Sequence, residues 1–327
     1  MRNKKWTVNS IKLFLIVINC VLLAAMLSAT AARADINAVM NNGVGARGPA
    51  MGFAQVSNST GVDSIFWNPA AIIEDDDLEI STHSSDIFGT SYKTIGGIFD
   101  LFGERWGLLV LRADQGNILE TALDPNGRPA ATGNAFNYNA TAVFLSYARR
   151  TAGLDWGLNL KYLAEGLQDA SAAGLALDLG LRAEPTPKLA LGFKLENLVS
   201  SPYKWNSASG AMENLPVKAR IGATLFPAGE RFALNCDLGI VSAGNPEIYT
   251  GGEYRISQNL SLRLGSSCGR LSGGVGIKYK GLTADYSYGR GSDFLEDAQR
   301  ISLSFTFWEN RSYAAPILSM KPDHLKT

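Results

Sequence analysis

From Leu154 to Trp308 the chain repeats one unit, a segment of about ten residues in which every second side chain is apolar. A break at Gly, Pro, Asn or Asp follows each segment. In the first one, Leu154, Trp156 and Leu158 alternate with polar or small residues. A period of two residues predicts β-strands with one apolar and one polar face. Repeated over this length, the pattern is typical of a transmembrane β-barrel with lipid outside and a polar lumen inside.

The start of the chain predicts export. A basic region that includes Arg2 and Lys5 precedes the apolar run 13–27, and Ala32-Arg33-Ala34 is a typical cleavage site. The apolar run is shorter than the roughly 20 residues that a membrane-spanning helix needs. We therefore expect residues 1–34 to be a cleaved signal peptide, and the mature chain to lie in the outer membrane of a Gram-negative-type bacterium.

Composition argues against several other classes of protein. Removing residues 1–34 takes away 5 of the 30 basic residues and none of the 30 acidic ones, so the mature chain has a net charge of −5. That balance argues against a nucleic-acid partner. His83 and His324 are far apart in sequence, and after cleavage the remaining cysteines are Cys236 and Cys268. We therefore expect no metal site, no cofactor and no disulfide framework.

The alternation and the turn residues predict an all-β fold, a transmembrane antiparallel up-and-down barrel of about 14 strands within residues 78–308. An even number of strands is typical of bacterial single-chain barrels. The strands are expected near 78–86, 91–99, 104–114, 136–148, 153–166, 172–184, 187–198, 216–227, 231–242, 246–256, 259–268, 271–280, 281–290 and 299–308.

Connection lengths alternate along this series of strands. Long connections, at 115–135, 199–215 and 291–298, follow odd-numbered strands, whereas tight turns such as 149–152 and 185–186 follow even-numbered ones. Barrels of this class have short periplasmic turns and longer outer loops. Aromatic residues and Met are enriched at interface cores. If the barrel binds a partner protein through its outer loops, the expected contacts in the second of them are Tyr203, Trp205 and Met212.

The polar faces of the strands carry charges of both signs. A selective ion path usually has one dominant sign. We therefore favour charges that pair across the lumen over an open permeation path. The candidate lumen residues are Lys161, Asp178, Arg182, Lys194, Glu196, Arg220, Glu253 and Arg263.

Residues 35–77 do not alternate. They are rich in Gly and small residues, with apolar anchors such as Met51, Phe66 and Trp67. A barrel of fourteen strands encloses more space than its own side chains fill. We therefore expect this segment to be a plug or hatch in the lumen. The alternative is a periplasmic tail, although disordered segments rarely carry so many aromatic residues.

The stretch GARGPAMGFAQVSNSTGVDSIFWNPAAI from Gly45 resembles the opening signature of the PorV/PorQ-like outer-membrane barrels, in which G-A-R-x-x-x-M-G leads to W-N-P-A-G. That family is similar to the FadL-type fatty-acid transporters, whose hatch also contains N-P-A. Shorter stretches, such as LGFKLENL from Leu191, extend the resemblance over nearly the whole mature chain. The sequence departs from the family at Ala71, where Gly is usual, and in the tail 309–327. The resemblance assigns to the hatch Gly45, Arg47, Met51, Gly52, Trp67, Asn68, Pro69 and Ala70.

The resemblance implies three functions. The first is that of a PorV-type adaptor in secretion, which holds secreted cargo proteins through its outer loops. The second is that of a FadL-like channel for a fatty-acid-like or other small hydrophobic molecule, and the third is a purely structural barrel. Expected partners in every case are outer-membrane lipids and the barrel-assembly machinery. A roomy apolar pocket under the hatch favours the channel, whereas a tightly packed charged lumen favours the other two.

An enzymatic function is not expected. His83 has Ser81 and Ser85 on the same strand face, but a period of two makes such neighbours inevitable. No nucleophile-elbow motif accompanies them. We therefore assign no catalytic residue.

Overall fold

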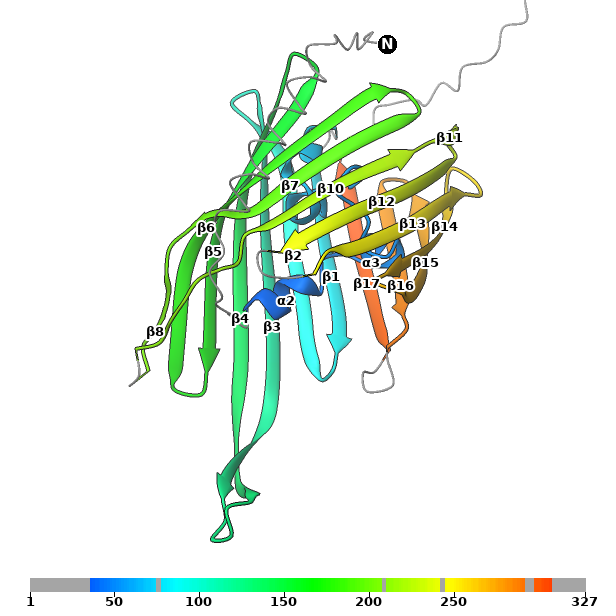
Figure 1. Ribbon diagram of the computed structural model, residues 1–327. Coiled ribbons are helices and arrows are strands. Elements are labelled where there is room, and N and C mark those ends of the chain that lie inside the picture. Colours follow the sequence, from blue (N-terminus) through cyan, green and yellow to red (C-terminus); the bar gives the residue numbers. More distant parts are fainter. Residues whose placement is uncertain (1–35, 75–77, 208–209, 242–244, 292–296, 308–327) are drawn as a thin grey trace, which may run out of the picture.

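The computed structural model describes residues 36–74, 78–207, 210–241, 245–291 and 297–307. The predicted signal peptide (1–34) and C-terminal tail (309–327) lie outside the described residues. The main feature is one antiparallel sheet that closes on itself, since its first strand pairs with its last (Figure 1). The strands of the barrel wall are β1 (Leu78–Ile87), β2 (Thr90–Leu101), β3 (Glu104–Leu123), β4 (Pro129–Thr151), β5 (Leu154–Leu167), β6 (Ala170–Thr186), β7 (Leu189–Ser200), β10 (Lys218–Leu225), β12 (Phe232–Val241), β13 (Glu247–Arg255), β14 (Leu260–Ser267), β15 (Arg270–Tyr279), β16 (Leu282–Gly289) and β17 (Ala298–Phe307).

Smaller elements join this wall. A hairpin of β8 (Tyr203–Trp205) and β9 (Met212–Glu213) pairs with the edge of β6, and β11 (Pro227–Glu230) lies in the turn between β10 and β12. Before the barrel come the short helices α2 (Ile36–Asn41), α3 (Arg47–Ala50) and α4 (Ser64–Trp67) and the 3-10 helix η1 (Pro69–Glu74). No helix within the described part of the chain is long and apolar enough to cross a membrane.

The predicted fold class is confirmed: the wall is an all-β, antiparallel barrel, and each of the fourteen predicted strands overlaps one observed strand. The connection predicted at 115–135 is wrong in part. Strands β3 and β4 continue through it as a hairpin that projects beyond the rest of the barrel (Figure 1). The ladder there has register shifts after Gln115 and Leu119. These shifts break the period of two, so the sequence pattern resembles a loop.

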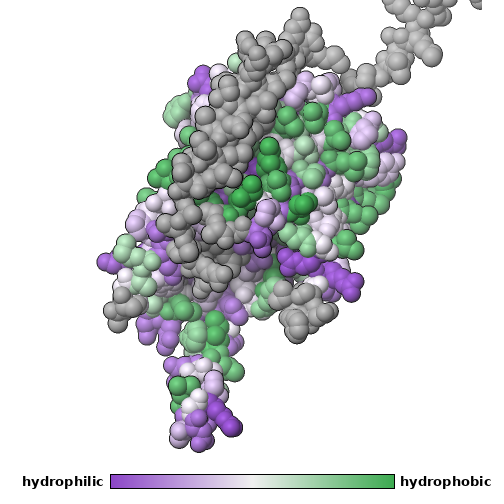
Figure 2. Space-filling view, viewed as in Figure 1, coloured by the Kyte–Doolittle hydropathy of each residue, from purple (hydrophilic) through white to green (hydrophobic). Residues whose placement is uncertain are grey.

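Side chains alternate between two environments along the wall. Ile95, Leu264 and Ile277 are exposed on the outer face, whereas Asn159 and Asp178 on the inner face are fully buried. Apolar residues gather over the strands on the visible surface, and hydrophilic ones gather toward the tip of the β3–β4 hairpin (Figure 2). A soluble monomer rarely exposes such an apolar surface. The distribution is the one that a barrel surrounded by lipid requires.

The two ends of the barrel differ. We call the end that carries the β3–β4 hairpin and the β7–β10 connection the loop end. The opposite end, which carries the short turns such as those between β2 and β3 and between β4 and β5, is the turn end. Leu78 and Phe307, where the wall begins and ends, pair with each other at the turn end.

The predicted surface contact at Tyr203 is wrong. This side chain is 0% exposed, because β8 folds back onto β6 and its ring packs where Gly174 leaves room. Trp205 is partly buried against the same core, and its indole donates to Glu213 Oε1 at 3.1 Å. Of the three predicted contacts, Met212 alone is largely exposed, at 63%.

Candidate functional site

The N-terminal segment, residues 36–74, lies inside the barrel wall (Figure 1). Helix α3 contacts β14, β15 and β16, whereas η1 contacts β4, β5 and β6. These two groups of strands lie in different parts of the wall, so the segment crosses the lumen between them. Met51, Ile65 and Ile72 are fully buried on the way.

Glycines on the inner face of the wall receive the backbone of this segment. A Cβ atom built on Gly265 would lie 2.1 Å from the amide nitrogen of Gly52, and one on Gly192 would lie 2.2 Å from the carbonyl oxygen of Val56. Glycine weakens a strand, and it often marks a site where another backbone approaches closely. Eight wall glycines would place a Cβ within 3 Å of the segment: Gly96, Gly107, Gly157, Gly180, Gly192, Gly251, Gly265 and Gly274.

Asn68 is the polar centre of the Trp-Asn-Pro-Ala motif. It is 0% exposed, and its Nδ2 donates to the carbonyl oxygens of Val56 (2.7 Å) and Leu181 (3.0 Å). Its Oδ1 accepts from the amide of Ala70 at 3.1 Å. The side chain therefore joins two parts of the segment to each other and to β6. Pro69 continues the contact, since it packs where Gly157 and Gly180 leave room.

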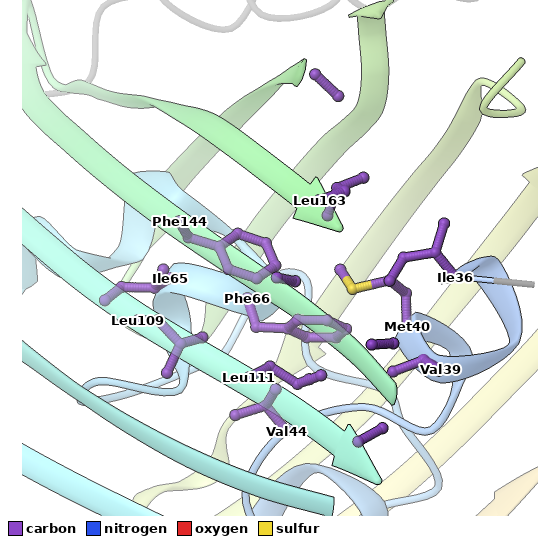
Figure 3. Packing of buried hydrophobic residues seen from close by; sticks show 14 of the residues in the cluster. Ile36, Val39, Met40, Val44, Ile65, Phe66, Leu109, Leu111, Phe144 and Leu163 are labelled. Atoms are coloured by element: carbon purple, nitrogen blue, oxygen red, sulfur yellow. The ribbon is translucent and has the colours of Figure 1, made fainter. Parts of the chain in front are cut away.

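Trp67 is the apolar centre of the same motif. Its indole Nε1 donates to the carbonyl oxygen of Val44 at 3.1 Å, and its ring meets Phe53 and Phe66 edge to face at 5.8 and 5.0 Å. Phe66 in turn faces Phe144 of β4, with ring centroids 6.0 Å apart (Figure 3). Aromatic pairs of this geometry add to the stabilisation from buried area. The segment thus carries a hydrophobic core that it shares with the wall.

The Gly-Ala-Arg part of the signature faces the other side of the barrel. Arg47 Nε lies 3.1 Å from Glu253 Oε2, and its Nη1 donates to Gln55 Oε1 and to the carbonyl oxygen of Asn58. Gly45 has a φ of 74° and leaves room for the carboxylate of Asp63. Desolvation raises the pKa of Asp63 to about 7, an effect that nearby Asp285 increases and Arg47 and Arg263 oppose.

Polar side chains of the wall hydrogen-bond the backbone of the segment, which forms little regular structure of its own. Asp237 Oδ2 accepts from the amides of Gln55 (2.8 Å) and Val56 (3.0 Å). Asn159 Nδ2 donates to the carbonyl oxygen of Ile65 at 2.8 Å, and Lys194 donates to that of Phe66. Buried backbone groups need such partners. Much of the polar lumen is therefore a docking surface for this segment.

All eight predicted lumen charges lie on the inner side of the wall, and six are less than 9% exposed. Lys161 Nζ is 2.6 Å from Asp178 Oδ1, and Lys194 Nζ is 3.1 Å from Glu196 Oε1. Arg263 binds Glu253 and Asp285, Arg182 binds Asp155, Glu184 and Glu74, and Arg220 donates to the carbonyl oxygen of Phe53 at 3.1 Å. Opposite signs are thus paired inside the barrel.

The Lys161–Asp178 pair gives a direct test of this pairing. Lys161→Met leaves the buried Asp178 carboxylate without its cation, so we expect the free energy of unfolding to fall by about 3 kcal/mol or more. The double variant Lys161→Met/Asp178→Leu removes both charges, so its free energy of unfolding should fall by less than that of the single variant. Denaturant titration of the refolded barrel measures both losses. Equal losses in the single and double variants would contradict a favourable interaction between the two side chains.

A cavity of about 500 Å³ lies between the N-terminal segment and the loop end. The segment forms its floor, which contains the apolar side chains of Met40, Phe53, Phe66 and Trp67 beside Asn41, Asn42 and Gly43. Its wall includes Tyr249 and a set of charged residues from several strands: Lys194, Glu196, Lys218, Arg220, Glu247, Arg270, Arg290 and Arg300. A concave, partly apolar site with a few polar groups is the usual form of a small-molecule site. Periodicity alone could not predict this cavity, because it is bounded by the segment and by strand ends from many parts of the chain.

The wall is irregular beside this cavity. Leu177 of β6 pairs with Val199 of β7, but Leu179 pairs with Leu195, so β7 contains extra residues that the ladder does not match. Asn197, within this bulge, has a φ of 57° and points inward, where it accepts from Lys161 and donates to the carbonyl oxygen of Pro216. Bulges of this kind interrupt inter-strand hydrogen bonding.

Comparison with known proteins identifies the fold. No protein-family model and no curated protein matches this chain. Among solved structures, the monoaromatic hydrocarbon channel CymD covers 81% of this chain and 98% of its own length, with 14% identity and a TM-score of 0.62. The chain has the fold of the FadL-type barrels.

Two further solved structures agree. The toluene transporter TodX of Pseudomonas putida covers 81% of this chain and 99% of its own, with 14% identity and a TM-score of 0.61. A FadL homologue of Pseudomonas aeruginosa covers 81% and 98%, with 13% identity and a TM-score of 0.54. The FadL-like part of the resemblance seen in the sequence is thus confirmed for the fold, whereas the PorV/PorQ part stays a prediction.

Proposed function

We propose that this protein is an outer-membrane channel for small hydrophobic molecules, and that the N-terminal segment is its hatch. The observation that carries this proposal is the cavity of about 500 Å³ whose apolar floor is built from the hatch itself. Apolar ligands gain free energy by leaving water for such a surface. The solved structures of similar fold include proteins described as a hydrocarbon channel and a toluene transporter, which supports the same class of ligand.

A route for the ligand follows from the geometry. A molecule that enters at the loop end reaches the aromatic floor formed by Phe53, Phe66 and Trp67 and stops there, because the hatch fills the lumen below. The bulge of β7 adjoins this cavity through Lys194 and Glu196. We propose this bulge as the lateral exit toward the lipid, since the ladder between β6 and β7 is interrupted there, beside the cavity.

The adaptor role in secretion is the second candidate. It requires exposed outer-loop anchors, and the burial of Tyr203 and the partial burial of Trp205 leave Met212 as the exposed one of the three. The paired charges of the lumen favour the adaptor role or a purely structural barrel, but the cavity at the loop end supports a small ligand, and we therefore rank both below the channel. A non-enzymatic role is part of the same proposal. His83 hydrogen-bonds neither Ser81 nor Ser85 among the described residues, so no Ser–His pair is assembled.

Mass spectrometry of the barrel, extracted gently from its native membrane, tests the proposal. A stoichiometric apolar small molecule on the wild-type barrel is the expected result, and toluene added to the purified protein should occupy the same cavity. Replacing Phe53 by Asp places a charge on the apolar floor and should abolish that binding, whereas Phe102→Asp, at an exposed turn, should not. Co-purifying surface proteins with a shared C-terminal domain, and no bound small molecule, would contradict the channel and support the adaptor.

A further inference from the structure

One cation in the cavity wall differs from the other buried cations of the barrel. Six Lys or Arg residues among the described residues are buried, and five of them form ion pairs with carboxylates: Arg105, Lys161, Arg182, Lys194 and Arg263. The sixth, Arg300 of β17, is 5% exposed and lines the cavity. No carboxylate among the described residues pairs with it.

Unpartnered donors surround this guanidinium. Arg300 pairs in register with Ser287 of β16 on one side and Ser85 of β1 on the other. Arg300 Nε and the Oγ atoms of both serines have no hydrogen-bond partner within the described part of the chain. Ser272 of β15 also lines the cavity and has an unpartnered, buried hydroxyl. Native proteins rarely leave so many adjacent buried polar groups without partners.

The guanidinium lies near an aromatic ring of the N-terminal segment and near a glycine of the wall. Its central carbon lies 5.7 Å from the centre of the Phe53 ring. It also lies close to Gly289, which is in register with Ser272: a Cβ built on Gly289 would lie 3.8 Å from Arg300 Nη1. The guanidinium therefore lies beside Phe53 of the aromatic floor and beside Gly289, the register partner of Ser272, at the boundary between the apolar and polar parts of the cavity.

The charge balance of the cavity favours an anion. Six of its lining residues are cations and two are acids: Lys194, Lys218, Arg220, Arg270, Arg290 and Arg300 against Glu196 and Glu247. Glu196 already pairs with Lys194 at 3.1 Å, and Glu247 accepts a hydrogen bond from Tyr249. A buried cation without a counter-charge is costly. An anionic ligand would supply the missing charge, and a guanidinium suits a planar carboxylate best.

We propose that Arg300 and Ser272 bind the carboxylate of a small organic acid whose compact apolar body, of the size of one aromatic ring, rests on Phe53. This inference rests on the proposed function and deepens it, because it names the ligand class as anionic amphiphiles in addition to neutral hydrocarbons. The compact body follows from the position of Arg300 next to the floor, since a carboxylate bound there places its next atoms directly against the aromatic rings.

Calorimetric titration of the intact, purified barrel with benzoate and with toluene tests this site. Benzoate should bind the wild type more tightly than toluene does. In Arg300→Met benzoate should bind at least about tenfold more weakly, because a charge-assisted hydrogen bond is lost. Toluene should bind that variant unchanged. Arg231→Met, which removes an exposed cation that does not line the cavity, is the matched control and should leave benzoate binding unchanged.

Several outcomes would overturn the site. Equal benzoate affinity in wild type and Arg300→Met, or an equal loss in Arg231→Met, would exclude a specific role for Arg300. Phosphate or decanoate that binds more tightly than benzoate would exclude the compact apolar acid. Arg300→Met should melt at or above the wild-type temperature, because it removes an unpaired buried charge. A large destabilisation would show that Arg300 has a structural partner. If benzoate binding depends on Arg300 but the barrel does not transport toluene, the carboxylate site is supported. The same result would contradict the channel for neutral hydrocarbons.

Discussion

Gly251→Val should displace the N-terminal segment from its position against the inner face of the barrel wall. A Cβ on Gly251 would lie 2.3 Å from the carbonyl oxygen of Met51, and neither backbone can move without breaking the ladder of β13 or the turn at Gly52. Overpacking of this kind costs about 1–3 kcal/mol in an ordinary core. Here the contact is backbone to backbone, so we expect the upper end of that range.

Trypsin digestion in detergent measures the expulsion. The bond after Arg47 should be protected in the wild type, where the Arg47 side chain is 12% exposed and bound to Glu253, and cut in Gly251→Val. The neighbouring Gly252 offers a matched control on the same strand. A Cβ there would lie no closer than 3.6 Å to another residue, the side chain of Leu234 on the outer face. Gly252→Val should therefore remain protected. Cleavage that is equal in the two variants would show that the glycine does not seat the segment.

Asn68→Ala should be the most damaging single truncation in the N-terminal segment. It leaves the carbonyl oxygens of Val56 and Leu181 and the amide of Ala70 without their partner, all at a fully buried site. A buried backbone group left unsatisfied costs about 1–3 kcal/mol. We therefore expect the free energy of unfolding to fall by about 3 kcal/mol or more.

A urea titration that monitors the change from folded to unfolded barrel measures this loss of free energy of unfolding. Asn126→Ala provides the control, since Asn126 lies in the exposed turn of the β3–β4 hairpin and its side chain makes no hydrogen bond there. The control should change stability by less than about 0.5 kcal/mol. A loss for Asn68→Ala as small as that of the control would mean that the motif does not hold the hatch together.

The strands of this barrel are predictable from sequence because the two faces of the wall meet different surroundings. Lipid selects apolar residues such as Ile95 and Leu264 on one face, and the polar interior selects residues such as Asn159 and Asp178 on the other. The alternation of apolar and polar residues along each strand follows directly from that difference. Where register shifts break the period, beyond Gln115, the sequence predicts a loop and the structure has a hairpin.

The inner face of the wall, where the N-terminal segment packs, has a sequence feature that the alternation of apolar residues does not reveal. Gly157, Gly180 and Gly251 occupy inward-facing positions, in step with Asn159, Asp178 and Glu253. Glycine is unfavourable in a strand interior, so repeated glycines on the polar face indicate that another backbone comes close. The number of glycines on each face of the strands would therefore indicate, from the amino-acid sequence, where the N-terminal segment packs against the wall.

The isolation of Arg300 and the burial of Tyr203 could not be predicted in this way. The first depends on which side chains of β15, β16, β1 and the N-terminal segment surround one guanidinium, and so on the closure of the barrel. The second depends on a loop that returns to β6 and fills the space beside Gly174. Both features arise from contacts between residues that are far apart in the chain, and a local sequence pattern does not predict such contacts.

The most direct test of the hatch is the conductance of single barrels in planar lipid bilayers, with and without residues 43–72. We expect the wild type to conduct little, because the segment crosses the lumen and is bonded to both sides of the wall, and the deletion variant to form an open pore of steady, much higher conductance. Gly251→Val, which keeps every other residue, should conduct like the deletion variant. Conductance that is the same in all three proteins would contradict the hatch and the transport route built on it.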